Sequence, residues 1–92
     1  MSRDPVWHVQ FAPGAARDLR KLGADAQRLI LRYLRTWLAT AENPRRFGKA
    51  LLGDLKGLWR YRVGDYRIVA KIEDDKFIVL VVTVGHRREV YD

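Results

Sequence analysis

The chain has 92 residues, which fits one domain, and its 18 Lys and Arg outnumber its 11 Asp and Glu to give a net charge of +7. This balance excludes an acidic scaffold and favours an anionic partner. The content of hydrophobic (48%) and aromatic (11%) residues argues for a packed core and against disorder, and the absence of cysteine excludes a disulfide framework, a thiol nucleophile and a cysteine-based zinc site.

Neither a membrane span nor an export signal is expected. Residues 1–5 lack the apolar segment of a signal peptide. The longest apolar stretch, residues 77–84, is interrupted by Thr83 and is too short to cross a bilayer. We therefore expect a soluble cytoplasmic protein with no membrane partner.

The first elements predicted are a short strand and a helix. Residues 6–11 are rich in strand-forming side chains. Pro13 suits the first turn of a helix because its missing N–H would have no partner there. Alanine and leucine then recur at helical spacing until Gly23, which tolerates the left-handed conformation that ends helices.

A second helix is expected from Asp25, as the capping residue, to residue 38. Its arginines occupy another face than its apolar residues, and the short connection predicts an antiparallel helical hairpin. The predicted apolar face consists of Leu29, Ile30, Tyr33, Leu34, Trp37 and Leu38, and the arginines are Arg28, Arg32 and Arg35. Pro44 ends this segment, and a basic connecting loop is expected to run to Gly57.

From Leu58 the apolar period changes to two, which predicts strands over residues 58–63, 66–72 and 77–84. Gly64 opens a two-residue turn between the first pair. The last strand is apolar on both faces, as an interior strand would be. The predicted fold class is therefore α+β, in the order β-α-α-β-β-β with a short final segment: one domain in which a helical hairpin packs on one face of a small, mostly antiparallel sheet.

Alternation places Arg60, Arg62 and Arg67 on the sheet face away from the helices, and we expect that face to be exposed. Arg87 follows the interior strand. Guanidinium groups match phosphate oxygens, which favours a phosphate-binding surface. A solvated face, or one that binds carboxylates of a protein partner, is the alternative interpretation.

The segments Leu55–Val69 (LKGLWRYRVGDYRIV) and Val84–Tyr91 (VGHRREVY) resemble the RelE/ParE toxin superfamily. The element order, length and basic charge agree with this family over nearly the whole chain. The resemblance implies a RelE-like toxin of a type II toxin–antitoxin system, which enters the ribosomal A site and cuts messenger RNA there. It also implies a cognate antitoxin partner that blocks the basic face, with operator DNA contacted only through the toxin–antitoxin complex.

The same resemblance implies the site residues. Arg60 and Arg62 stand where RelE places two lysines, and Arg67 and Arg87 match its two arginines. Tyr91 matches its tyrosine if a two-residue shortening after Arg88 is allowed. We expect the catalytic residues to be Arg67, Arg87, Tyr91 and His86, and the RNA-binding residues to be Arg60, Arg62, Lys56, Lys49 and Arg88.

The expected chemistry is metal-free attack of the 2′-hydroxyl on its own phosphorus, with neither metal nor organic cofactor. Arg67 and Arg87 would stabilise charge on the phosphate. Tyr91 would accept a proton if nearby arginines lower its pKa, and His86 can exchange one near neutral pH. Which residue is base and which is acid stays open, because arginine is a poor base.

Two further functions remain open at this point. A ParE-like toxin would inhibit DNA gyrase by binding, without catalysis of its own. A degenerate, inactive member would serve only in an antitoxin complex bound to operator DNA.

Overall fold

The computed structural model describes residues 6–88. These residues contain two α-helices, α1 (Pro13–Lys21) and α2 (Ala24–Tyr33), and one π-helical turn, η1 (Leu34–Leu38). The strands are β1 (His8–Phe11), β2 (Lys49–Ala50), β3 (Leu58–Val63), β4 (Tyr66–Glu73) and β5 (Ile78–His86). Short 3₁₀ turns are η2 (Pro44–Phe47), η3 (Gly53–Leu55) and η4 (Asp74–Lys76).

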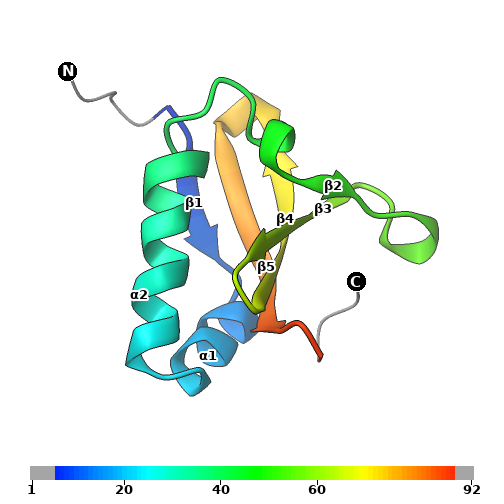
Figure 1. Cartoon of the computed structure of the whole chain (residues 1–92). Helices are drawn as coiled ribbons and strands as arrows, with labels where there is room; N and C mark the ends of the chain where they lie inside the picture. Colours follow the sequence, from blue (N-terminus) through cyan, green and yellow to red (C-terminus); the bar gives the residue numbers. More distant parts are fainter. Residues whose placement is uncertain (1–5, 89–92) are drawn as a thin grey trace.

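The five strands of the described residues form one sheet in the order β1-β5-β4-β3-β2, with the helices on one face (Figure 1). β1 runs parallel to β5, and the other neighbours are antiparallel. The predicted α+β class and hairpin-on-sheet arrangement are confirmed, and β5 is interior as expected. The predicted connecting loop differs, because it contains β2 and two 3₁₀ turns.

The start and end of α1 follow the sequence signals. Pro13 occupies the first turn, and Gly23 lies just past the end with φ 92°. The expected cap at Asp25 is wrong: α2 begins after Gly23, no side chain caps it, and Asp25 lies in its first turn, where it contacts Arg28. An acidic side chain there still favours the positive end of the helix dipole.

The second helix changes pitch where it continues into η1. The amide of Ala39 donates to the carbonyl of Leu34 at 2.9 Å, which closes a wider turn than that of an α-helix. Ile30 and Leu34 are buried, as expected, but Leu29 is 42% and Trp37 is 53% exposed. The predicted apolar face was therefore too wide, and the π turn carries Trp37 away from the core.

The main core lies between the helices and one face of the sheet. Tyr61 and Val63 of β3, and Ile68 and Ala70 of β4, point into it, as the alternation predicted. A second, smaller apolar cluster lies on the opposite face, where Leu51 and Val69 are buried and Leu58 and Val82 pack against them. The opposite face of the sheet is therefore partly apolar.

A β-bulge interrupts the pairing of β4 with β5. Val69 pairs with Thr83 but Ala70 pairs with Val81, so Val82 is an additional residue in β5. After the bulge Val84 pairs with Ile68 in the main core.

The segment between β2 and β3 extends away from the body of the domain (Figure 1). Leu52 in it is 84% exposed. Over residues 6–88, no helix has both the length and the apolarity that a membrane crossing requires.

Candidate functional site

The sheet register brings the predicted arginines of β3 and β4 together. Arg62 pairs directly with Arg67, and Lys49 of β2 pairs with Arg60. Paired residues project from the same side of a sheet, and this side is opposite the helices. We call the surface formed by Lys49, Arg60, Arg62 and Arg67 the cationic face. These four positive side chains come from three strands.

The four side chains differ in depth. Lys49 and Arg62 are exposed, whereas Arg60 is 9% and Arg67 is 2% exposed. The expectation that Arg67 and Arg60 lie on an exposed surface is therefore wrong. The second apolar cluster occupies the same side of the sheet. Gly85 lies directly opposite Arg67 and has no side chain, so the side chain of Arg67 can lie close to the backbone of β5.

Arg67 is tied to the turn between β3 and β4. Its Nη1 donates to the carbonyl of Gly64 at 3.0 Å and to that of Tyr66 at 2.9 Å. Gly64 has φ 59°, which confirms the predicted turn with glycine first. Arg67 thus holds this turn in place with a buried, charge-assisted donor.

Arg87 lies beside the same turn. Its amide donates to the carbonyl of Asp65 at 2.7 Å, and its Nη1 is 3.7 Å from Oδ1 of Asp65. Both side chains are more than half exposed, so solvent weakens this pair. The structure therefore places Arg62, Arg67 and Arg87 around one end of the sheet, as the sequence predicted.

His86 is on the other side of the sheet. It pairs with Tyr66, whose ring packs against the main core, and the two ring centroids are 6.0 Å apart in an edge-to-face contact. Nδ1 of His86 accepts from the amide of Arg88 at 3.3 Å. The structure does not bring this imidazole onto the cationic face.

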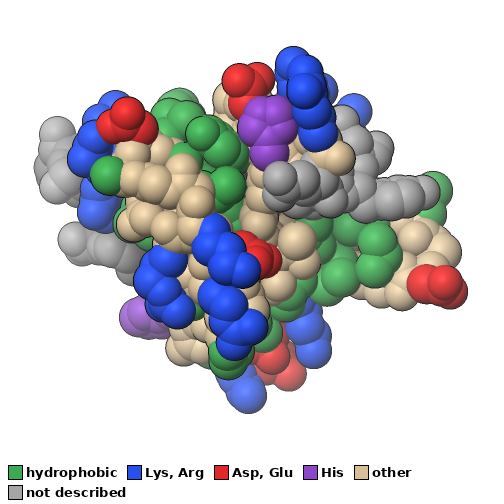
Figure 2. All heavy atoms as spheres, turned by 90° about the horizontal axis from the view of Figure 1, so that it is seen from below, with side chains coloured by type: hydrophobic (Ala, Val, Ile, Leu, Met, Phe, Trp, Pro, Cys, Tyr) green, Lys and Arg blue, Asp and Glu red, His purple; other side chains and the backbone are tan. Residues whose placement is uncertain are grey.

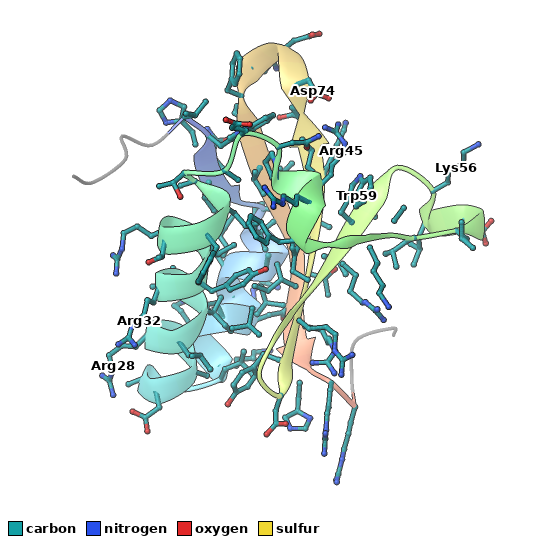
Figure 3. The ribbon with its side chains drawn as sticks, turned by 45° about the horizontal axis from the view of Figure 1, so that its top comes forward. Arg28, Arg32, Arg45, Lys56, Trp59 and Asp74 are labelled. Atoms are coloured by element: carbon teal, nitrogen blue, oxygen red, sulfur yellow. The ribbon has the colours of Figure 1, made fainter. Side chains whose placement is uncertain are left out.

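The remaining predicted residues are spread out. Lys56 lies on the segment between β2 and β3 that extends from the body of the domain (Figure 3). Arg88 is exposed next to His86. Tyr91 lies outside the described residues. Figure 2 shows Lys and Arg side chains in separate groups, so the positive charge is not confined to one patch.

One polar cluster was not predicted from the sequence. Arg45 of η2 binds Asp74 through both guanidinium nitrogens, at 2.9 and 2.6 Å, and lies 5.9 Å from the ring centroid of Trp59 (Figure 3). The hydrogen bond from Arg45 lowers the pKa of Asp74. The cluster fastens η2 to the turn between β4 and β5, and nothing in the local pattern indicates a pair 29 residues apart.

A buried tyrosine supports the same segment from the core side. Tyr61 donates its hydroxyl to the carbonyl of Pro44 at 2.9 Å, and burial raises its pKa. This tyrosine faces the main core, away from the cationic face.

Among residues 6–88, no three His, Asp or Glu side chains come together in an arrangement that could hold a metal ion. The arrangement of cations at the end of the sheet is instead suited to binding an anion. Exposed guanidinium groups at Arg62 and Arg87 present paired donors, and buried Arg67 keeps the turn between them rigid.

A helical hairpin on one face of a five-stranded, mostly antiparallel sheet is the RelE-like α+β fold. In the structure of the RelBE2 toxin–antitoxin complex from Mycobacterium tuberculosis, the similar chain superposes with a TM-score of 0.81 at 32% identity, over 91% of this chain and 100% of that chain.

Sequence comparison agrees with the fold. The family model of the ParE toxin of type II toxin–antitoxin systems (parDE) matches residues 9–91. Toxin RelE of M. tuberculosis is 36% identical over 91 residues, 99% of this chain and 92% of the relative. Toxin RelG of the same organism is 32% identical over 83 residues, 90% of this chain and 93% of the relative. The chain belongs to the RelE/ParE superfamily of type II toxins, and within it is RelE-like.

Proposed function

We propose that this toxin is an endoribonuclease that enters the ribosomal A site and cuts translated messenger RNA. The observation that carries the proposal is the direct pairing of Arg62 with Arg67 on the cationic face, with Arg87 beside the adjoining turn. The similarity to toxin RelE supports the same assignment.

The roles proposed for the three arginines differ because their side chains differ in burial. Arg62 and Arg87 are exposed and would contact the scissile phosphate. The contact between Arg87 and Asp65 is long and solvated, so a phosphate can replace the carboxylate at little cost. Arg67 is a positioning residue, because its Nη1 already donates to two backbone carbonyls of the turn.

The proposed reaction is an internal transfer at phosphorus. The 2′-oxygen forms a bond to the phosphorus, the bond from phosphorus to the 5′-oxygen breaks, and a 2′,3′-cyclic phosphate results. The 2′-hydroxyl gives up its proton to a base, for which Tyr91 in its ionised form stays the predicted residue, and the departing 5′-oxygen takes a proton from water. His86 faces the other side of the sheet, so its predicted role in proton transfer lacks support. The proposal uses neither metal nor cofactor.

The proposal includes a cognate antitoxin in the cytoplasm. The structure from M. tuberculosis is a toxin–antitoxin complex. By analogy an antitoxin with acidic side chains would cover the cationic face, since exposed Arg62 and Lys49 attract carboxylates as well as phosphates. Operator DNA would be contacted only through that complex.

The test is the mapping of message 5′ ends after induction, together with cleavage of a ribosome-bound message in vitro. In-frame cuts within translated codons are expected. A single 2′-deoxy nucleotide at the cut site should abolish cleavage there, because the attacking hydroxyl is missing. Cleavage that survives this substitution would exclude the proposed transfer.

Single substitutions test which arginines act on the phosphate. Arg62→Ala and Arg87→Ala should each lower the cleavage rate by about 10²–10³, the usual effect of removing one charge-stabilising donor. Arg32→Ala is the matched control, since Arg32 is an exposed arginine that points away from the sheet on α2 (Figure 3). Equal rates for all three variants would contradict the assignment.

A second candidate is gyrase inhibition without catalysis. It is favoured by one observation, the match of residues 9–91 to a family model described as the ParE toxin. Intact messages after induction, together with loss of DNA supercoiling by purified gyrase in the presence of the toxin, would support this candidate over the nuclease.

A further inference from the structure

Two aromatic side chains lie exposed and in contact at the end of the helical hairpin. Trp37 of η1 is 53% exposed and Phe47 of η2 is 39% exposed, and their ring centroids are 5.8 Å apart in an edge-to-face contact. Single exposed apolar residues are ordinary, but a tryptophan in contact with a second exposed aromatic ring forms a patch. Neither residue belongs to the site described above.

The backbone turns Trp37 outward. The π-helical turn is closed by the bond between Ala39 and Leu34, and Leu34 and Leu38 on either side of Trp37 are buried. Turns of this kind are rare and often occur at functional sites. The exposure of Trp37 is thus set by the helix geometry.

A hollow adjoins the aromatic pair. It has a volume of about 200 Å³ and is lined by Ala41, Glu42, Asn43, Arg46 and Phe47. The lining combines an aromatic face with a carboxylate, an amide and a guanidinium, which can hydrogen-bond to the edge of a flat polar ring. Arg46 is exposed and free to contact a phosphate nearby.

The chain leads directly from this pair to the cationic face. Gly48 follows Phe47 and lies so close to β3 that a Cβ atom would be 2.8 Å from Cε1 of Tyr61. Lys49 comes next and pairs with Arg60. Two residues span at most about 7 Å, so Phe47 lies near Lys49. Phe47 is on the helix side of the sheet, and an RNA strand that contacts both residues would pass around the edge strand β2.

We propose that Trp37 and Phe47 form a base-stacking subsite for single-stranded RNA, on the strand that continues across Lys49 to the cleavage site. Aromatic faces that hold bases, together with cations that follow the backbone, are the general means of binding single strands. The inference rests on the proposed nuclease function and adds to it a contact outside the cleavage site. Aromatic rings next to the cations Arg46 and Lys49 favour RNA as the occupant, because its bases can stack on the rings while its phosphates meet the cations.

The test measures the affinity of the purified toxin for a short 2′-O-methyl oligoribonucleotide, which binds but cannot be cut because its 2′-oxygens are blocked. Trp37→Ala should raise the dissociation constant about 5- to 150-fold, as expected for one stacked base. Trp37→Phe keeps an aromatic ring and should change it by less than about threefold. Leu31→Ala, which removes an exposed apolar side chain of α2, is the matched control and should bind as the wild type does.

Two more readouts separate stacking from a general loss of structure. RNA should quench the tryptophan fluorescence of the wild type, and Trp37→Phe should lose most of that quenching while it keeps its affinity. Lys49→Ala should lower the slope of log affinity against log salt by about 0.7, the value for one phosphate contact on a single strand, and Trp37→Ala should leave the slope unchanged.

The outcomes distinguish this inference from the proposed function. If messages are cut in cells but Trp37→Ala binds the oligonucleotide as the wild type does, the subsite is refuted and the nuclease stands. If Trp37→Ala keeps RNA affinity but loses affinity for the antitoxin, the patch is a protein contact and the inference is equally refuted. If binding depends on Trp37 but no message is cut, the subsite stands and the nuclease proposal fails.

Discussion

Replacing Arg67 by alanine removes a buried guanidinium that holds the turn between β3 and β4. Its Nη1 makes two hydrogen bonds to backbone carbonyls, at 3.0 and 2.9 Å. Hydrogen bonds from charged donors contribute about 1.5–3 kcal/mol each, and because these two share one donor atom we expect a loss of about 2–4 kcal/mol. In a domain of this size that corresponds to a fall in Tm of roughly 10–25 °C.

Arg62 supplies the matched comparison, because it is the direct cross-strand partner of Arg67 but is exposed. Arg62→Ala should change the free energy of unfolding by no more than about 0.5 kcal/mol, as is usual for exposed positions. Arg67→Lys keeps the charge but not the planar fork, so it should fall between the two.

Urea unfolding followed by far-ultraviolet circular dichroism measures these differences directly. The expected result is a large drop in the midpoint for Arg67→Ala with an unchanged slope, and almost none for Arg62→Ala. Equal midpoints for the two alanine variants would refute the structural role given to Arg67. In that case its effect on cleavage would have to come from contact with RNA.

Three other variants test the packing around η2. Asp74→Asn should make the free energy of unfolding less dependent on pH in the acid range. Arg45 lowers the pKa of Asp74, so their pair stabilises the fold fully above the unfolded pKa of about 4. That stabilisation is lost as the pH falls through the lower pKa of the folded state. Tyr61→Phe should cost about 1–2 kcal/mol, because the buried carbonyl of Pro44 loses its donor. Gly48→Ala should cost about 1–3 kcal/mol, because its Cβ would meet the ring of Tyr61; urea midpoints measure both.

Controls for these variants come from the same fold. Gly14 in the first turn of α1 has open space around it, so Gly14→Ala should be neutral or stabilising. A Gly48→Ala protein as stable as Gly14→Ala would show that the close contact is readily relieved. An acid profile for Asp74→Asn that matches the wild type would show that the bond to Arg45 does not persist in solution.

The elements that follow from local periodicity were predictable. The helical spacing after Pro13 and the alternation from Leu58 fixed the element types, and Gly64 marked the turn that sets Arg62 opposite Arg67. Register then follows from the turn, so the meeting of these arginines could be inferred from the sequence.

The burial of individual side chains was not predictable in the same way. Alternation tells which side of a sheet a residue occupies, but the burial of Arg67 depends on Gly85 and the second apolar cluster, which come from other segments. The exposure of Trp37 depends on a π turn that has no sequence rule. Ion pairs between distant segments, such as Arg45 with Asp74, depend on the folded chain.

The bulge explains the position of His86. Strict alternation from Val79 and Val81 would put His86 on the side of the arginines, but the additional residue Val82 reverses the order beyond it. Alternation along the sequence alone therefore predicts the wrong side of the sheet for His86.

Because Val82 is an additional residue, β5 can lose one residue there without a shift in its later pairs with β4. A chain without Val82 would keep Thr83 opposite Val69 and every later partner unchanged, at the cost of one side chain in the smaller apolar cluster. Loss of Leu80 instead would make Val79 and Val81 neighbours, and one of them would have to leave the core. Loss of one residue from this strand should therefore be tolerated best at Val82, where no other side chain changes its place.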